Sequence, residues 1–425
     1  MRLQLKNKNW RMVKIKEIGK VITGKTPSTF DSSNFGGPYP FITIPDLKNQ
    51  RYIEKTERTL SEKGTRVMKN LKLPPKAVMV SCLATVGEIG ITVKESFTNQ
   101  QINSVICNED KVVPEFLYYY FKYAKLRLLK YSGSVYTNIS KSKFEDFEIE
   151  IPQDINEQRR IAEILSAFDE KIELNNKINQ ILEEMAQAIF KHWFVDFKFP
   201  GHEKAKSRSE RSSTTGIKFV NSELGKIPEG WRVGCLGDGI CCEIIKPGIK
   251  KFEGEKIYLA TADVVKNEIV NLKTRVTYNN RPIRANMEPV LNSIWFAKMV
   301  NTYKVLFFFE GNKEDLEKYI LSTGFMGIRA LENLQYYLYC FINSERFHQI
   351  KDTLVQGAVQ EAITNTNVKG IKILLPPTDL INEFNKKIEP LIMEIFKNKV
   401  ENQKLSALRD LLLPKLMSGE MKVKV

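Results

Sequence analysis

An internal repeat is the feature that most limits how this chain of 425 residues can fold. Trp10-Arg11 recurs as Trp231-Arg232, which is an offset of 221 residues. Three further landmarks recur at offsets of 223 or 224, namely Gly133 to Ser140 as Gly357 to Thr364, Phe147 to Pro152 as Ile371 to Pro376, and Asn179 to Ile189 as Asn402 to Leu412. Four landmarks in one order at nearly one offset indicate two copies of a single structural unit.

Each copy has the same layout. A stretch rich in strand and turn residues comes first, at 10–151 and 220–375, and it ends in apolar residues at every second position, as in a strand. A long helical stretch follows. The sequence therefore predicts an α+β fold, in which two similar mixed α/β domains are joined by two long antiparallel coiled-coil helices with a pseudo-twofold repeat.

The first helical stretch, 155–194, has Asp154 as its predicted N-cap and Glu157 at the capping-box position. Apolar residues then follow at steps of 4, 3 and 4 on either side of a predicted break at Asn175-Asn176, and polar residues there could fix the register of a coiled coil. We expect a rod of about 60 Å. The second helix is predicted to start near Thr378, to be kinked or closed by Pro414 and to end near Gly419. The expected seam residues are Ile161, Leu165, Phe168, Ile172, Ile178, Leu182, Met185, Ile189, Ile388, Ile392, Ile395, Leu405, Leu408 and Leu412.

These patterns predict five segments along the chain. They are a first domain at 1–153, a first spacer helix at 154–197, a linker at 198–219, a second domain at 220–377 and a second spacer helix at 378–420. The linker contains serines and Lys/Arg residues with almost no apolar side chain, which is typical of a solvated connection.

The net charge of +15 predicts attraction to a polyanion, with nucleic acid as the first candidate and a membrane surface as the second. No apolar run approaches the roughly 20 residues that span a bilayer. The six cysteines form no CxxC pair and the three histidines are isolated, so we expect a reduced, cytoplasmic protein without a metal. The neighbouring Cys241 and Cys242 are expected to be buried or inert.

Gly19 to Thr26 matches the phosphate-binding pattern G-x-x-x-x-G-K-[ST]. That loop binds phosphate only where a helix begins at its Lys-Ser/Thr, whereas Pro27 and a run of turn residues follow here. We therefore expect a strand that leads into a turn. No other catalytic motif is present, and Tyr118 to Phe121 suits core aromatics better than a base-stacking platform.

Several segments together resemble specificity subunits of type I restriction–modification enzymes. The junction Trp193 to Pro200 with Asn221 to Trp231 carries the resemblance most specifically. The other matching segments are Gly24 to Ser28, Thr43 to Leu47, Asn99 to Asn103 and Leu411 to Gly419. In the second copy, Ser322 to Gly324 stands where Asn99 to Gln101 would, and no Thr-Pro-Ser follows Trp231.

The resemblance implies a subunit that recognises double-stranded DNA and catalyses nothing itself. Each domain would contact one half of a split asymmetric site, and the helices would set the spacing and bind two modification (methyltransferase) subunits. S-adenosylmethionine, ATP and Mg would be bound by those and by restriction subunits, and no cofactor by this chain. Three alternatives stay open: a stand-alone DNA-binding regulator, a subunit serving a fused methyltransferase–nuclease, and an NTP-dependent enzyme that uses Gly19 to Thr26.

Contacts to phosphate would give salt-dependent affinity, and contacts to base edges would give discrimination of roughly 1–3 kcal/mol per bidentate pair. The candidate contact residues of the first domain are Lys25, Thr26, Ser28, Tyr136, Asn138, Ser140 and Lys141. Those of the second domain lie between Gln360 and Asn367 and are Gln360, Thr364, Asn365 and Asn367.

Overall fold

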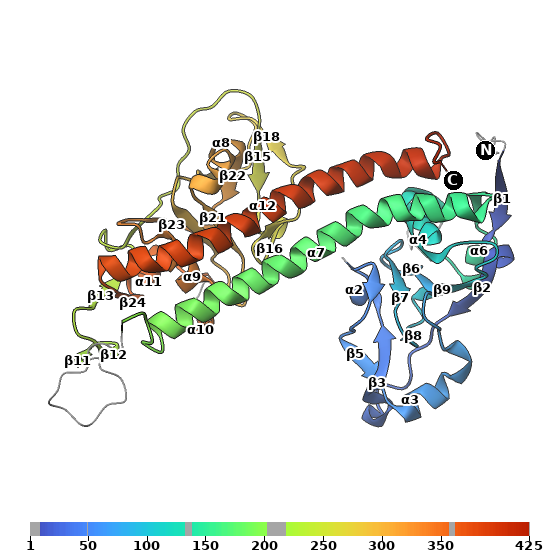
Figure 1. Cartoon of the computed structure of the whole chain (residues 1–425), viewed down its shortest axis with the longest axis horizontal. Coiled ribbons are helices and arrows are strands. Elements are labelled where there is room, and N and C mark those ends of the chain that lie inside the picture. The colour runs from blue at the N-terminus through green and yellow to red at the C-terminus, as the bar shows by residue number, and fades with distance from the viewer. Residues whose placement is uncertain (1–8, 49, 132–137, 202–217, 357–361, 425) are drawn as a thin grey trace. The chain divides into compact units, whose positions relative to one another are not determined.

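The computed structural model describes residues 9–48, 50–131, 138–201, 218–356 and 362–424 (Figure 1). The chain divides into two compact units, one formed by Met1–Glu173 with Asn402–Val425 and the other by Leu174–Glu401. The two longest helices, α7 (Ile155–Phe194) and α12 (Thr378–Met417), contribute residues to both units. Each unit thus consists of a strand-rich part and a section of both helices.

The first unit contains a five-stranded sheet of order β2-β9-β6-β7-β4, a three-stranded sheet of order β5-β3-β8 and the pair β1-β10. Its strands are β1 (Trp10–Lys14), β2 (Gly19–Thr23), β3 (Phe35–Ile42), β4 (Tyr52–Ile53), β5 (Arg58–Leu60), β6 (Val78–Ser81), β7 (Ile89–Thr92), β8 (Phe97–Thr98), β9 (Ile102–Cys107) and β10 (Glu148–Pro152). Its shorter helices are α1 (Ile15–Ile18), α2 (Ile44–Leu47), α3 (Glu62–Val67), α4 (Pro114–Tyr123), α5 (Lys125–Tyr131) and α6 (Lys141–Glu145).

The second unit contains four-stranded sheets of order β14-β23-β20-β21 and β18-β15-β22-β19, together with the pairs β13-β24, β11-β12 and β16-β17. Its strands are β11 (Phe219–Ser222), β12 (Gly225–Pro228), β13 (Arg232–Cys235), β14 (Cys242–Ile244), β15 (Lys256–Leu259), β16 (Val264–Val265), β17 (Glu268–Ile269), β18 (Arg275–Val276), β19 (Ala285–Met287), β20 (Ser293–Ala297), β21 (Val305–Phe308), β22 (Tyr319–Ser322), β23 (Phe325–Ala330) and β24 (Lys372–Leu375). Its shorter helices are α8 (Asp315–Lys318), α9 (Gln335–Ile342), α10 (Glu345–Gln356) and α11 (Asn365–Lys369).

The two units share one topology. The antiparallel order β2-β9-β6-β7 returns as β14-β23-β20-β21, and the parallel pair of β3 with β8 returns as β15 with β22. The register also repeats: Arg11 lies opposite Ile151 in the pair β1-β10, and Arg232 lies opposite Leu375 in the pair β13-β24. The duplication predicted from the sequence is therefore a duplication of structure.

Each unit has its own aromatic core around one short buried helix. In the first unit that helix is α4, where Tyr118 to Phe121 are all buried, so the interpretation as core aromatics is confirmed. In the second unit the helix is α9, which is buried from Tyr336 to Ile342. Cys241 and Cys242 are buried in the core of the second unit, as expected.

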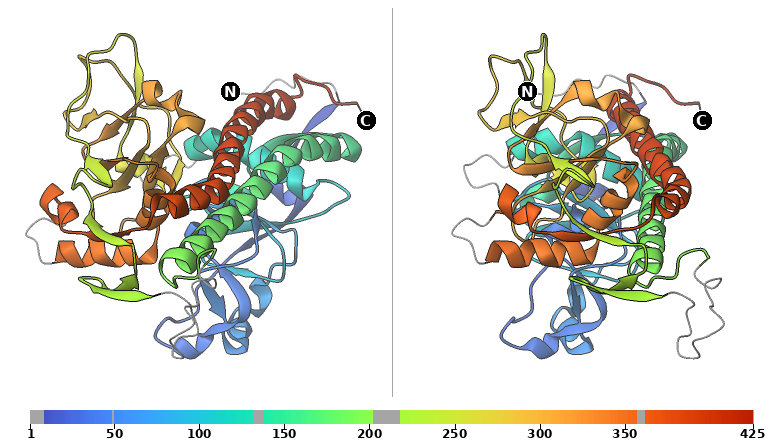
Figure 2. Two further views of the ribbon diagram at one scale, coloured as in Figure 1. Left: turned by 60° about the vertical axis from the view of Figure 1, so that its left-hand side comes forward. Right: turned by 90° about the vertical axis from the view of Figure 1, so that its left-hand side faces the viewer.

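The helices α7 and α12 lie side by side and antiparallel in each unit (Figures 1 and 2). As the residue number rises along α7, its partner number falls along α12, through the contacts Asp169–Arg409, Asn175–Glu401 and Asn179–Asn398. Asp154 caps α7 as predicted, since its Oδ1 accepts a hydrogen bond from the backbone N–H of Asn156 at 2.8 Å. Glu157 does not complete a capping box with Asp154 in any hydrogen bond described, and its carboxylate accepts from Nε1 of Trp10 at 3.1 Å.

The predicted break in α7 is wrong. Of the two effects predicted for Pro414, closing of the helix is also wrong, and a kink stays a prediction. α7 has no break at Asn175-Asn176, because the low helix propensity of asparagine is outweighed by the burial of Asn175 and its hydrogen bond to Glu401 at 2.8 Å. Pro414 does not close α12, which continues to Met417 and ends before Gly419, whose φ is +66°. A proline one turn from a helix end forfeits only one backbone hydrogen bond, so helix beyond it is tolerated.

The predicted seam residues differ in how deeply they are buried. Ile161, Leu165, Ile388, Ile392 and Ile395 are buried. The half-buried members are Phe168, Ile172, Ile178, Leu182, Ile189, Leu405 and Leu412.

Met185 and Leu408, which occupy equivalent positions in the two copies, are exposed and do not belong to the seam. In α7 the buried face instead passes through Ala186 and Phe190, one residue further on. The cause is the period of the α-helix, about 3.6 residues per turn. A line of residues chosen at 3.5 residues per turn rotates around the helix by about 20° per heptad and so leaves the buried face.

Gly19 to Thr23 form strand β2, and residues 24–31 form no helix. The predicted strand and turn are therefore confirmed, and these residues lack the helix start that a phosphate-binding loop requires. Among the described residues no helix is long and apolar enough to cross a membrane.

Candidate functional site

Residues 24–28 leave strand β2 and lie against the turn between β8 and β9 in the first unit. The backbone N–H of Lys25 donates to the carbonyl oxygen of Thr98 at 3.0 Å. A Cβ on Gly24 would lie 2.1 Å from that same oxygen, so only glycine allows this close approach. The side chains of Lys25 and Ser28 are left exposed at the surface.

The turn between β8 and β9 is held by its own side chains. Asn99 is buried, and its Oδ1 accepts from the backbone N–H of Gln101 at 3.1 Å while its Nδ2 donates to Oε1 of Gln101 at 3.0 Å. Gln100, between them, is exposed, and its Oε1 accepts from the Thr26 hydroxyl at 2.7 Å. Two side chains from loops far apart in sequence thus meet at the surface.

The loop between β6 and β7 and the segment from residue 138 complete this group of loops. The backbone N–H of Cys82 donates to Gln101 O at 2.7 Å, and Ile139 N–H donates to Cys82 O at 2.8 Å. Asn138 is exposed and pairs with Leu83 in an isolated β-bridge. Backbone hydrogen bonds therefore fix four loops of the first unit against one another.

The remaining predicted DNA-contact residues of the first unit are Ser140, Lys141 and Tyr136, and their surroundings differ. Ser140 caps α6, because its Oγ accepts from the backbone N–H of Lys143 at 3.4 Å. Lys141 is exposed and forms an ion pair with Glu145 at 3.6 Å, which solvent weakens. Tyr136 lies outside the described residues.

The second unit repeats the backbone arrangement of these loops. Lys298 N–H donates to Gly324 O at 3.0 Å, and Ile363 N–H donates to Lys298 O at 3.0 Å. Met299 pairs with Ala362 in an isolated bridge. These contacts correspond to those of Cys82, Ile139, Leu83 and Asn138, although the side chains differ.

The second unit's candidates cluster around the start of α11. Thr364 Oγ1 accepts from the backbone N–H of Asn367 at 3.2 Å, and Asn367 Oδ1 accepts from Thr364 N–H at 3.1 Å, which forms a capping box. These two side chains are engaged with each other, whereas Asn365 is exposed. Gln360 lies outside the described residues.

A buried lysine holds the loop between β20 and β21. Nζ of Lys351 on α10 donates to the carbonyl oxygens of Met299 at 2.9 Å and Thr302 at 2.7 Å, and its side chain is 1% exposed. Burial lowers the pKa of Lys351, and Asp352 partly offsets this. Asp352 also accepts a hydrogen bond from the Tyr303 hydroxyl at 2.7 Å. The loop is therefore anchored by both its carbonyls and one side chain.

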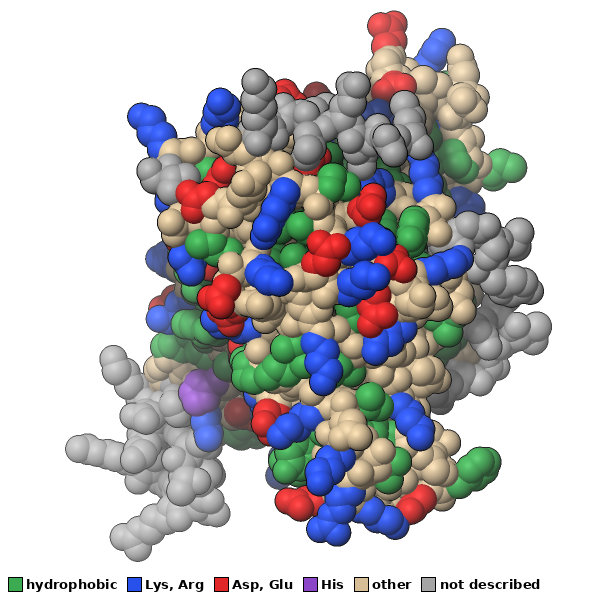
Figure 3. Space-filling model, turned by 90° about the vertical axis from the view of Figure 1, so that its right-hand side faces the viewer, with side chains coloured by type: hydrophobic (Ala, Val, Ile, Leu, Met, Phe, Trp, Pro, Cys, Tyr) green, Lys and Arg blue, Asp and Glu red, His purple; other side chains and the backbone are tan. Residues whose placement is uncertain are grey.

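Positive charge is distributed rather than concentrated on the face drawn in Figure 3, where Lys and Arg side chains alternate with Asp and Glu. Lys25 and Lys141 in the first unit, and Lys246 after β14 in the second, are exposed.

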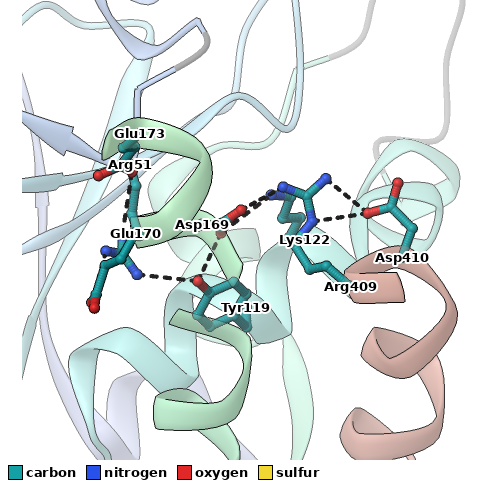
Figure 4. Close-up of polar contacts among 8 residues, drawn as sticks. All are labelled: Arg51, Tyr119, Lys122, Asp169, Glu170, Glu173, Arg409 and Asp410. Carbon is teal, nitrogen blue, oxygen red and sulfur yellow. Dashed lines mark hydrogen bonds and ion pairs between the residues drawn. The ribbon is translucent and has the colours of Figure 1, made fainter. Parts of the chain in front are cut away.

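In the first unit a polar network joins the strand-rich part to both long helices (Figure 4). Tyr119 accepts a hydrogen bond from Arg51 at 3.2 Å and donates one to Asp169 on α7 at 2.7 Å. Asp169 also forms ion pairs with Arg409 on α12 and with Lys122 at 3.8 Å. Burial raises the pKa of Asp169, but Lys122 and Arg409 outweigh it and hold the pKa below its usual value.

Sequence and structure comparisons identify the relatives of this chain. Residues 7–184 match the family model described as "Type I restriction modification DNA specificity domain". The chain is 29% identical to the MjaIX specificity subunit of Methanocaldococcus jannaschii, over 98% of this chain and 94% of the relative. It is 36% identical to the HindI specificity subunit of Haemophilus influenzae, over 39% of this chain and 35% of the relative.

A solved structure shares the fold. The crystal structure of the S subunit of a type I restriction-modification system from M. genitalium aligns with a TM-score of 0.56 at 17% identity, covering 97% of this chain and 98% of that one. The α+β fold with a duplicated unit is the one expected from the sequence. The chain is therefore similar to type I restriction enzyme specificity subunits over nearly its whole length.

Sequence reasoning did not assign a role to two side chains that the structure brings into the loops. Gln100 lies in the segment Asn99 to Asn103, which resembles specificity subunits, but its residue type alone does not indicate a DNA contact. Its position beside Thr26 results from the packing of residues after β2 against the β8–β9 turn. Lys351 lies on an amphipathic helix, where a lysine is usually at the surface.

Proposed function

We propose that the chain is the DNA sequence-recognition subunit of a type I restriction–modification complex, in which each unit contacts one half of a bipartite site. The observation that carries this proposal is the repeated set of loops. In the first unit, backbone hydrogen bonds join the β6–β7 loop to the β8–β9 turn and to the segment before α6. In the second unit, equivalent bonds join the β20–β21 loop to the β22–β23 turn and to the segment before α11. A backbone arrangement that is the same in both units, with different side chains on its loops, suits two domains that recognise different DNA sequences.

The antiparallel helices are proposed to set the distance between half-sites and to bind two modification subunits. Exposed apolar side chains on α7 support a protein partner there, with Leu174 at 51%, Ile181 at 55% and Met185 at 46% exposure, spaced by seven and four residues along one side of the helix. The partner subunits would supply S-adenosylmethionine-dependent adenine methylation. Restriction subunits would supply ATP- and Mg-dependent cleavage.

Mapping of methylated adenines in the host tests the proposal. Deletion of this chain should abolish methylation at one bipartite motif, and restoring the chain alone should restore that motif. The proposal would be contradicted if deletion of the chain left every methylated motif unchanged, or if the motif lost on deletion were a single uninterrupted block. Sequence-specific binding by the purified chain without methyltransferase subunits, together with no chain-dependent methylation, would instead support a stand-alone DNA-binding protein.

A further inference from the structure

The loop between β18 and β19 in the second unit holds an apolar side chain out in solvent. Ile283, near the end of this loop, is 97% exposed. Water around an apolar side chain is unfavourable, so free energy is gained wherever a binding partner covers it. Single exposed aliphatic residues are common at protein surfaces. The stiffness of the loop and its surroundings therefore decide what this one does.

The backbone that carries Ile283 is braced from both sides. The guanidinium of Arg281 donates hydrogen bonds from Nε to the carbonyl oxygen of Ala285 at 3.2 Å and from Nη1 to the carbonyl oxygen of Tyr278. It also lies over the ring of Tyr278, 4.3 Å from the centroid. The backbone N–H of Ala285 donates to Pro282 O at 2.8 Å. A partner that covers Ile283 would therefore need to order little of the loop, which lowers the cost of binding.

The same loop is joined to the candidate DNA-contact loops of the second unit. The backbone N–H of Thr323, in the β22–β23 turn, donates to the carbonyl oxygen of Arg284 at 2.8 Å. This turn is one of the loops whose backbone arrangement repeats in both units. In the loop that follows β14, the backbone N–H of Gly248 donates to Asn286 O at 2.9 Å. Ile283 therefore lies beside the loops that the proposed function assigns to DNA.

The apolar side chain is accompanied by cations. Arg284, the next residue, is exposed and forms no ion pair with any described residue. Lys246 and Lys250, on the neighbouring loop, are exposed and likewise form no ion pair within the described part of the chain. Glu288, the nearest carboxylate in sequence to Arg284, pairs instead with Lys256 at 3.8 Å. Duplex DNA matches this combination, because its phosphates lie beside the apolar parts of its bases.

We propose that Ile283 is a DNA-binding residue of the second unit, which buries its side chain against bases of that unit's half-site while Arg284 contacts an adjacent phosphate. The inference deepens the proposed function and rests on it. Ile283 lies outside every segment by which the chain resembles specificity subunits, so its contact need not be shared with relatives that recognise other sequences. Apolar side chains that meet bases add affinity without adding charge.

The experiment measures how tightly the complex purified from the host binds a duplex that carries its methylated motif, at several salt concentrations. Ile283→Ala removes most of the apolar side chain, Ile283→Leu keeps its size and apolar character, and Arg284→Ala removes the neighbouring cation. Leu291→Ala is the matched control, because Leu291 is an exposed aliphatic residue that precedes β20, at the opposite end of this strand from the β20–β21 loop. Thermal unfolding of each variant confirms that it folds.

With Ile283→Ala, we expect the dissociation constant to rise about 5- to 50-fold. The slope of log affinity against log salt concentration should stay the same, because no phosphate contact is lost. Arg284→Ala should reduce that slope by about one. Ile283→Leu and Leu291→Ala should bind like the natural chain.

A folded Ile283→Ala complex that binds the duplex as tightly as the natural one, or that loses affinity only through a changed salt slope, would overturn the inference and leave the proposed function intact. An unchanged slope with Arg284→Ala would overturn the phosphate contact. Absence of any chain-dependent bipartite motif with the natural chain would refute the proposed function itself.

Discussion

Nδ2 of Asn398 on α12 donates a hydrogen bond to Oδ1 of Asn179 on α7 at 2.9 Å, between two buried side chains. Nδ2 of Asn179 is buried and has no hydrogen-bond partner among the described residues. A polar pair with one unsatisfied donor lowers stability, but it can align only in one register, because any shift of the helices would bury both amides against apolar neighbours. We infer that this pair fixes how α7 and α12 align.

Replacing one member of the pair should cost more stability than replacing both. Asn398→Leu leaves the amide of Asn179 buried without its remaining partner, so we expect the free energy of unfolding to fall by about 1–3 kcal/mol. The double variant Asn179→Leu with Asn398→Leu should recover that loss, since neither polar group remains. Urea unfolding measures both, with the exposed Gln180→Ala as a control expected within about 0.5 kcal/mol of the natural chain. A double variant less stable than the single one would contradict this account.

The two carboxylates that contact Arg409 should differ sharply in importance. Asp169→Asn removes the negative charge of a side chain that is 9% exposed and pairs with both Lys122 and Arg409, so we expect a loss of about 3–5 kcal/mol in the free energy of unfolding. Asp410→Asn removes the charge of a side chain that is 63% exposed, and less than about 1 kcal/mol should be lost. Equal losses, measured by chemical denaturation, would show that the network in Figure 4 does not hold the helices.

Lys351 should act on the second unit's loop alone. Lys351→Met keeps the length of the side chain but removes the donor to Met299 O and Thr302 O, so amide hydrogens at 298–304 should exchange faster. The equivalent loop at 82–88 in the first unit should exchange as before. Arg346→Ala, an exposed change on the same helix, is the control, and similar acceleration in that variant would exclude a specific role for Lys351.

Stability should depend on pH through His348, which packs on Tyr303 with ring centroids 4.4 Å apart. Burial, with a smaller effect of Lys351, lowers the pKa of His348 to about 4. The unfolded chain, with a pKa near 6.5, therefore binds more protons than the folded one between these values. The free energy of unfolding should fall as the pH drops from about 6.5 to about 4. His348→Gln should reduce this slope, as urea unfolding at several pH values would show, and an unchanged slope would contradict the role of His348.

The duplication and the helix bounds could be predicted because they depend on patterns that run along the chain. Arg11 and Ile151, which are paired in the first unit, correspond in the repeat to Arg232 and Leu375, which are paired in the second. Asn175 was misinterpreted because propensity argued for a break, whereas its partner Glu401 is 226 residues away. A single helix in isolation gives no sign of such a partner.

The candidate site could be predicted only in outline. The loops were located from their turn residues, but the contact of Thr26 with Gln100 needs strands that meet only in the folded sheet. Thr364 and Asn367 suggested base contacts by residue type, and the structure engages them in a helix cap. Residue type alone does not distinguish a polar side chain that faces a ligand from one that satisfies the backbone.

Exchange of one unit tests the central claim most directly. Residues 10–151 would be replaced by the matching segment of a related specificity subunit with a different methylation motif, and methylated adenines would be mapped. The account predicts that one half of the bipartite motif changes to that of the donor, while the other half and the number of bases between them stay the same. A change in both halves, or in neither, would contradict the division of recognition between two units.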